Sequence, residues 1–207
     1  MRIAVMGTGG VGGYFGARLA LGGCDVTFIA RGTQLAALRT HGLRVLSAGG
    51  DMHIELVTAT DDPGEVEPVD LVLFGVKLWD TEAAAELIKP MIGSNTAVVS
   101  FQNGVLKDEI LQRVLGERTV MGGVCYIAAT IAEPGVIRHT GAMQRLVFGE
   151  QNGATSERAK AFLAACQKAA RNAVARSDAA SSCSPNTSRC IVPVWRITSG
   201  SAIVAAM

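Results

Sequence analysis

The 207-residue sequence has almost no net charge, few aromatic residues and no long hydrophobic run. Its formal net charge is +1, which argues against the basic surface that nucleic-acid-binding proteins and peripheral membrane proteins carry. The longest apolar runs, such as residues 71–76, are too short to span a bilayer. We therefore expect neither a nucleic-acid partner nor a membrane association.

The five cysteines form no Cys-x-x-Cys pair and show no spacing typical of metal ligands, so we predict no metal site. The first ten residues contain one basic residue and then an apolar run broken by glycines, which is unlike a secretory signal peptide. An odd cysteine count without such a peptide favours reduced thiols and a cytoplasmic location. We expect Cys24, Cys125 and Cys166 to be small buried apolar residues.

The end of the chain lacks several residue types altogether. Residues 171–207 contain no Leu, Lys, Glu, Tyr or Phe and are enriched in Ser, Arg and Cys. Because Leu, Lys and Glu are strong helix formers, their loss predicts no helix in this segment. We therefore divide the chain into a domain over residues 1–170 and an aberrant tail over residues 171–207.

The preceding part of the chain alternates between strand-like and helix-like patterns. Nearly half of all residues, 49%, are hydrophobic, which fits a globular protein with a buried core. Strands that alternate with helices predict an α/β fold with a parallel, doubly wound sheet. We expect residues 42–47 and 53–60 to pair across a turn. The predicted strands are 2–6, 25–30, 42–47, 53–60, 70–76, 96–101, 121–130, 135–140 and 144–150, and the predicted helices are 10–21, 33–40, 80–89, 105–115 and 156–170.

The residues after the first strand fit the pattern G-x-G-x-x-G. A strand precedes them and a helix follows, as in dinucleotide-binding loops. In such loops the first glycine permits a tight turn, the second lets the backbone approach a pyrophosphate, and the third allows helix–strand packing. The alternative is a glycine-rich turn without a ligand. We predict a Rossmann-type sheet whose cofactor contacts Gly7, Thr8, Gly9, Gly10, Val11 and Gly12.

Arg31 follows the second predicted strand, at the position that selects the cofactor. NAD-binding domains usually carry Asp or Glu there to bind the ribose hydroxyls, and this sequence has no acid at that point. A guanidinium can instead bind a 2′-phosphate through two hydrogen bonds. Arg31 therefore favours NADP over NAD, and the alternative is a solvated surface charge.

Two polar residues, Lys77 and Asn103, follow successive buried strands. Ligands of open α/β sheets bind at the carboxyl ends of the strands. Lys77 can contact the ribose or phosphate of a cofactor or a substrate carboxylate, and Asn103 offers both a donor and acceptors. Each is alternatively a capping or turn residue, since Asn-Gly is common in turns. We expect the neighbouring Trp79 to pack at the start of a helix.

Taken in order, these motifs resemble ketopantoate reductase, also called 2-dehydropantoate 2-reductase. The resemblance covers about residues 1–170 and includes Val76-Lys77, Gln102-Asn103-Gly104 and the segment AATIAEPGVIRHTG at 128–141. It implies reduction of 2-dehydropantoate, a small 2-oxo acid, to pantoate with NADPH in pantothenate biosynthesis.

The same resemblance assigns roles to the candidate residues. It implies that the glycine loop and Arg31 hold NADPH, and that Lys77 and Asn103 lie where the cofactor meets the substrate. It also implies that Ala128 approaches the cofactor through its backbone. These residues are therefore expected to bind cofactor or substrate, and none of them is expected to donate the catalytic proton.

The sequence departs from the family pattern after about residue 170. In the family an all-helical domain follows, which supplies much of the dimer contact, and in its first helix a lysine shortly after a tryptophan protonates the substrate carbonyl. Here Trp195 is followed by Arg196-Ile197-Thr198, and a guanidinium does not release its proton near neutral pH. We therefore predict that the catalytic lysine is absent. The alternative function is a truncated NADP(H)-binding module with little or no activity, whose exposed docking face favours self-association.

Three interpretations of the tail are open. It is a natural linker or disordered tail, a redox or metal-binding device built on Cys183 and Cys190, or the product of a reading-frame change near residue 170. We favour the reading-frame change, because the composition and the family pattern fail at the same place.

Overall fold

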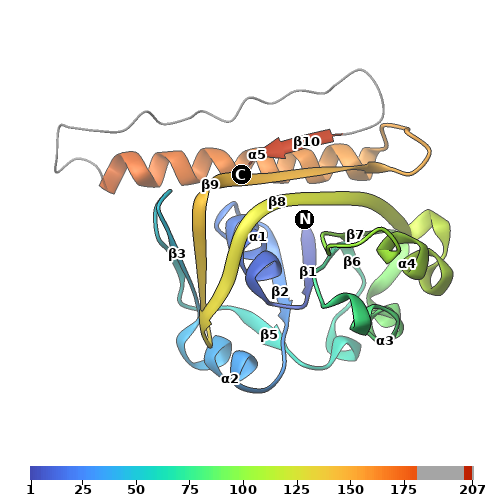
Figure 1. Cartoon of the computed structure of the whole chain (residues 1–207), viewed down its shortest axis with the longest axis horizontal. Coiled ribbons are helices and arrows are strands. Elements are labelled where there is room, and N and C mark those ends of the chain that lie inside the picture. Colours follow the sequence, from blue (N-terminus) through green and yellow to red (C-terminus); the bar gives the residue numbers. More distant parts are fainter. Residues whose placement is uncertain (181–202, 207) are drawn as a thin grey trace.

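The computed structural model describes residues 1–180 and 203–206, which form a mixed ten-stranded sheet with helices on both faces (Figure 1). The strands are β1 (Arg2–Met6), β2 (Asp25–Ile29), β3 (Leu43–Ser47), β4 (Met52–Ile54), β5 (Thr58–Thr60), β6 (Val69–Phe74), β7 (Ile92–Ser100), β8 (Val120–Glu133), β9 (Val136–Glu150) and β10 (Ile203–Ala206). The α-helices are α1 (Gly10–Leu21), α2 (Gly32–His41), α3 (Thr81–Leu87), α4 (Lys107–Leu115) and α5 (Glu157–Ala180). Short 3₁₀ helices are η1 (Pro63–Glu65), η2 (Leu78–Asp80), η3 (Lys89–Met91) and η4 (Glu117–Thr119).

Six neighbouring strands form the parallel part of the sheet, in the order β5-β2-β1-β6-β7-β8. Numbered along the chain, this order is 3-2-1-4-5-6, the order of doubly wound dinucleotide-binding folds. The predicted doubly wound α/β fold is confirmed for this part. The winding reverses between β1 and β6, which is where such folds bind their ligands.

Beyond β8 the sheet is mixed, so the predicted parallel arrangement does not extend to the pairing of β8 with β9. Strands β8 and β9 pair antiparallel and are joined by Pro134 and Gly135 alone. Gly135 has φ +77, and two residues cannot carry the chain back to the other end of the sheet as a parallel connection requires. The two strands predicted at 135–140 and 144–150 are one long strand whose register shifts between them.

The predicted pairing of residues 42–47 with 53–60 is confirmed only in part. Strand β3 pairs antiparallel with β4 at Leu43 and Ile54. The remainder of the predicted second strand forms the separate strand β5, which pairs parallel with β2. Strand β3 also pairs parallel with β9, so the hairpin extends the sheet beyond its parallel part.

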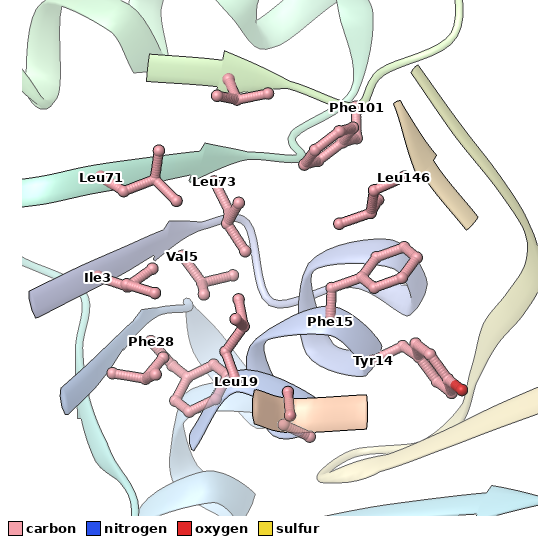
Figure 2. Close-up of a cluster of buried hydrophobic side chains, with 14 of the residues drawn as sticks. Ile3, Val5, Tyr14, Phe15, Leu19, Phe28, Leu71, Leu73, Phe101 and Leu146 are labelled. Atoms are coloured by element: carbon pink, nitrogen blue, oxygen red, sulfur yellow. The ribbon is translucent and has the colours of Figure 1, made fainter. Parts of the chain in front are cut away.

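Side chains of the central strands alternate between two hydrophobic layers. On β1, Ile3 and Val5 join the layer under α1 and α5, whereas Ala4 and Met6 join the layer under α3 and α4. Figure 2 shows the first layer, in which side chains of β1, β2 and β6 meet those of α1. Because both faces are covered, β6 consists almost entirely of apolar residues rather than alternating ones.

Helix α5 covers the first layer and extends further than expected. Ala159, Phe162 and Cys166 are buried on one face with Leu163 half-buried, which confirms the predicted amphipathic helix. The helix then continues to Ala180, so the prediction of no helix after residue 170 is wrong for residues 171–180. That prediction neglected alanine, the strongest helix former, which recurs in this stretch.

The other predictions for the tail concern Cys183, Cys190 and Trp195, which lie outside the described residues. Strand β10, close to the end of the chain, pairs antiparallel with β9. The helices of the described part include none that is both long and apolar enough to cross a membrane.

Candidate functional site

The glycine loop between β1 and α1 lies at the switch point of the sheet. Gly7 has φ +96, and a Cβ atom there would lie 2.9 Å from the nitrogen of Val76, the second residue after β6. A Cβ atom at Gly12 would collide with the Gly7 carbonyl oxygen. These two glycines therefore allow the turn and the close packing of α1 against the sheet, as the sequence pattern predicts.

Gly9 differs from its neighbours because nothing packs against it. No heavy atom would lie within 4 Å of a Cβ atom at this position, so the loop backbone faces open space. Helix α1 has no side-chain cap and no acidic residue in its first turn. Its first helical hydrogen bond runs from the Gly13 nitrogen to the Gly9 oxygen, which leaves the amides of Gly10, Val11 and Gly12 without helical acceptors. The open side of the loop and these amides fit a phosphate group.

Thr8 holds the glycine loop in place through hydrogen bonds to β2. Its backbone amide and its hydroxyl both donate to the Ile29 carbonyl, at 3.2 and 3.1 Å, and the side chain is 4% exposed. The Gly7 amide donates to the same oxygen. The loop is thereby fixed to the end of β2, two residues before Arg31.

Gln34 on α2 is a residue of this site that the sequence analysis missed. Its Nε2 donates to the Thr8 carbonyl at 3.0 Å, and its Oε1 accepts from the Gly135 amide at 3.0 Å. One amide thus joins the glycine loop to the β8–β9 turn. No sequence signal separates Gln34 from other glutamines on a helix, because the contact depends on how β9 folds back.

Strand β8 also approaches the glycine loop, through the residue that follows Ala128. A Cβ atom at Gly10 would collide with the Ala129 carbonyl oxygen, whereas Ala128 is exposed and its oxygen accepts from the Thr140 hydroxyl. Successive residues of a strand point to opposite faces. Ala129 makes the backbone contact with the glycine loop, and the approach of Ala128 to the cofactor stays a prediction.

Arg31 is the second residue after β2 and is the N-cap of α2. Its backbone is extended, its side chain is exposed, and its guanidinium has no hydrogen bond or ion pair with any described residue. The first turn of α2 carries no acid that would neutralise it. The guanidinium is thus available to an external anion beside the glycine loop.

The strands β1, β6 and β7 end together, which brings Lys77 and Asn103 to the same edge. The Gly75 amide donates to the Met6 carbonyl, and the Phe101 amide donates to the Phe74 carbonyl. Lys77 and Asn103 are both exposed, and within the described part of the chain neither side chain has a hydrogen-bond partner. A Cβ atom at Gly104 would lie 3.1 Å from Leu78 Cδ2, so the two loops are in contact.

The same loops expose apolar side chains, in contrast to two predictions. Trp79 is 80% exposed, so the prediction that it packs at a helix start is wrong. Val105 is 90% exposed and precedes α4, which begins at Lys107 rather than at residue 105. The spacing of apolar residues could not show that Trp79 and Val105 are exposed. It does not tell whether a residue packs on the core or lies in a loop after a strand.

The thiols of the described residues are uncharged near neutral pH and add no negative charge to this site. Burial raises the pKa of Cys24 and Cys125 and raises the pKa of Cys166 further, so all three stay protonated near neutral pH. Among residues 1–180 and 203–206, no three His, Cys, Asp or Glu side chains come together as a metal site. The site presents open backbone amides, exposed cations and a neutral amide, a set suited to an anionic ligand.

The strand order and the glycine loop at the switch point define a Rossmann-type domain. A family model described as ketopantoate reductase PanE/ApbA matches residues 3–153, and the chain belongs to this family.

Relatives and solved structures agree with this assignment. The chain is 37% identical to an uncharacterized oxidoreductase, YkpB, of Bacillus subtilis over 164 residues, covering 78% of this chain and 53% of that protein. It is 32% identical to a 2-dehydropantoate 2-reductase of Mesorhizobium japonicum over 199 residues, covering 86% of this chain and 60% of that protein. The crystal structure of 2-dehydropantoate 2-reductase from Porphyromonas gingivalis W83 superposes with a TM-score of 0.77 at 35% identity, covering 82% of this chain and 61% of that one. The chain thus spans between half and two thirds of these relatives.

Proposed function

We propose that this chain binds NADPH at the glycine loop and takes part in reducing 2-dehydropantoate, or a closely related 2-oxo acid, to the 2-hydroxy acid. The observation that carries the proposal is the open backbone at Gly9, at the switch point of a sheet with the dinucleotide-binding strand order. The names of the relatives support the reaction, which belongs to pantothenate biosynthesis.

NADPH rather than NADH is proposed because of the charges at the end of β2. Arg31 is exposed, has no anionic partner among the described residues and follows the strand end that holds the glycine loop. A 2′-phosphate adds negative charge that a guanidinium binds through charge-assisted hydrogen bonds. No acidic residue follows β2 to bind the two ribose hydroxyls of NADH.

The residues at the carboxyl edge would orient the substrate. NADPH supplies the hydride when bound. The ammonium of Lys77 would attract the substrate carboxylate or the ribose, and the Asn103 amide would hydrogen-bond to either. The first lysine after β7, Lys107 at the start of α4, is buried and paired with Asp108 at 2.7 Å, which leaves Lys77 after β6 as the exposed ammonium near these loops.

A second candidate is an NADP(H)-binding module that turns over little or nothing. It is favoured by the balance of groups at the described site, where the glycine loop and Arg31 are proposed to bind the cofactor but Lys77 is the single exposed ammonium proposed to serve the substrate. Loss of a general acid typically removes about 10²–10⁴ in rate.

Two measurements on one preparation separate these candidates. NADPH fluorescence titration measures binding, and NADPH oxidation with 2-dehydropantoate measures turnover. Binding with turnover supports the reductase, and binding without turnover supports the module. Absence of NADPH binding by the folded chain contradicts both.

Replacing Arg31 tests the proposed cofactor preference. Arg31→Ala is expected to weaken NADPH binding by about 10- to 100-fold, because charge-assisted hydrogen bonds to the 2′-phosphate are lost. NADH binding should change by less than about threefold. Arg118→Ala is a matched control, since Arg118 is also exposed and lies in η4, away from the glycine loop. An equal loss for both cofactors would show that Arg31 does not bind the 2′-phosphate.

A further inference from the structure

Gln102 follows β7 and uses its whole side-chain amide within the protein. Its Nε2 donates to the Val76 carbonyl at 2.9 Å and to the Thr81 hydroxyl at 2.8 Å. Its Oε1 accepts from the Ser100 hydroxyl at 2.9 Å. A side-chain amide has two donor hydrogens, and both are used in these hydrogen bonds. The Gln102 side chain is therefore fixed in one orientation.

The two groups that Gln102 donates to are the two ends of one loop. Val76 is the second residue after β6, and Thr81 is the first residue of α3. Between them the chain turns at Lys77, whose carbonyl accepts from the Asp80 amide at 2.9 Å. Thr81, which accepts a hydrogen bond from Gln102, in turn donates its own hydroxyl hydrogen to the Leu78 carbonyl at 2.7 Å.

This loop has little else to hold it in place. Lys77 and Trp79 are exposed, and Leu78, which is 37% exposed, rests against Gly104, so no fully buried side chain anchors the loop between Val76 and Asp80. Its conformation therefore depends mainly on hydrogen bonds, and the Gln102 amide makes two that reach it from the segment after β7.

We propose that Gln102 is a positioning residue that fixes Lys77 relative to Asn103. This inference rests on the proposed function, in which those two side chains orient cofactor and substrate. Gln102 precedes Asn103, and the carbonyl that it holds belongs to the residue before Lys77. One amide thus sets the separation of the two loops. A misplacement of about 1 Å in such a site costs on the order of 10²-fold in rate.

The first test observes the loop itself and needs no cofactor. Trp79 and Trp195 are the two tryptophans of the chain, so Trp195→Phe leaves Trp79 as the sole reporter. In that background, Gln102→Leu is expected to speed the depolarisation of Trp79 fluorescence. Gln102→Glu keeps the side-chain size but lacks the donors, and it should act in the same direction. Gln151→Leu is the control, since Gln151 is exposed and lies in the turn after β9. Unchanged Trp79 depolarisation in both Gln102 variants would overturn the proposal.

The second test asks whether Gln102 acts through Lys77. Gln102→Leu is expected to lower kcat/KM, or the NADPH affinity where no turnover is found, by about 10- to 100-fold. In a Lys77→Ala background the same substitution should have almost no further effect, because the group it positions is gone. Effects that multiply independently would show a general structural role and overturn the proposal. If the parent chain binds no NADPH, the proposed function fails, and the Trp79 measurement alone decides whether Gln102 fixes the loop.

Discussion

Gly9 and Gly12 lie three residues apart, at the N-cap and in the first turn of α1, but a methyl group would meet different surroundings at each. At Gly9 no heavy atom lies within 4 Å, and the backbone is extended with φ −88. At Gly12 the methyl group would collide with the Gly7 carbonyl oxygen. One position is free for a ligand, and the other is required by the fold.

Alanine substitutions should separate these two requirements. Gly9→Ala is expected to leave the free energy of unfolding within about 0.5 kcal/mol of the parent while weakening NADPH binding at least about tenfold. Gly12→Ala should lower the free energy of unfolding by roughly 1–3 kcal/mol, because α1 must move away from the loop. Urea unfolding and NADPH titration measure the two effects. Full NADPH affinity in Gly9→Ala would contradict binding at this loop.

At the scale of elements, the start of α5 is tied to two strands by one arginine. Arg158 donates to both carboxylate oxygens of Glu150, each at 2.7 Å, and to the Thr96 carbonyl at 3.2 Å. Glu150 ends β9, and Thr96 lies in β7. Hydrogen bonds from Arg158 hold the pKa of Glu150 below its usual value, with burial acting in the opposite direction.

This ion pair predicts a pH-dependent contribution to stability. A lowered pKa in the folded state means that the contribution is present above the unfolded pKa of Glu150 and is lost as pH falls through the folded value. Glu150→Gln is therefore expected to lower the free energy of unfolding by about 1.5–3 kcal/mol near neutral pH, and by much less in acid. Urea unfolding at about pH 7 and about pH 3 measures the difference.

The exposed pair Lys160–Glu157 on the same helix provides the control for this prediction. Its side chains are 54% and 90% exposed, and solvent-exposed pairs contribute little. Lys160→Ala should therefore change stability by less than about 1 kcal/mol. A Glu150→Gln effect that persists unchanged in acid would show that packing, not the ion pair, is responsible.

For the whole molecule, β3 and the C-terminal strand β10 cover an edge of β9 that could otherwise pair with a strand of another chain. Strand β3 covers one part of the β9 edge, and β10 pairs with residues 145–148 further along. Helix α5 packs on α1, where a Cβ atom at Gly22 would lie 2.9 Å from Ala169, and Asn172 donates to the Leu21 carbonyl at 3.2 Å. The domain proposed over residues 1–170 is thus held by contacts that continue just beyond it.

A fragment ending at residue 180 tests how much of the chain the fold and the cofactor site need. It retains every described contact of α5 with α1, so it should fold and bind NADPH within about twofold of the full chain. It lacks β10, and an unpaired strand edge promotes association. We therefore expect more self-association, measured by light scattering. An unfolded fragment would show that the remainder of the chain belongs to the domain.

The sequence predicted what local patterns encode. Apolar runs and their breaks located β1, β2, β6 and β7, and the glycine pattern located the loop at the switch point. The buried face of α5 followed from its periodicity. These features depend on residues that are neighbours in the chain, so the sequence alone determined them. The family resemblance also came from the sequence alone.

Tertiary structure decided the features that depend on distant residues. Pro134 and Gly135 turn β9 back along β8, which makes the sheet mixed and brings Ala129 rather than Ala128 against Gly10. The glutamines Gln34 and Gln102 bridge loops that are far apart in sequence. A strand's register and the partner of a side-chain amide are set by which segments meet in space, and no local pattern in the sequence records that.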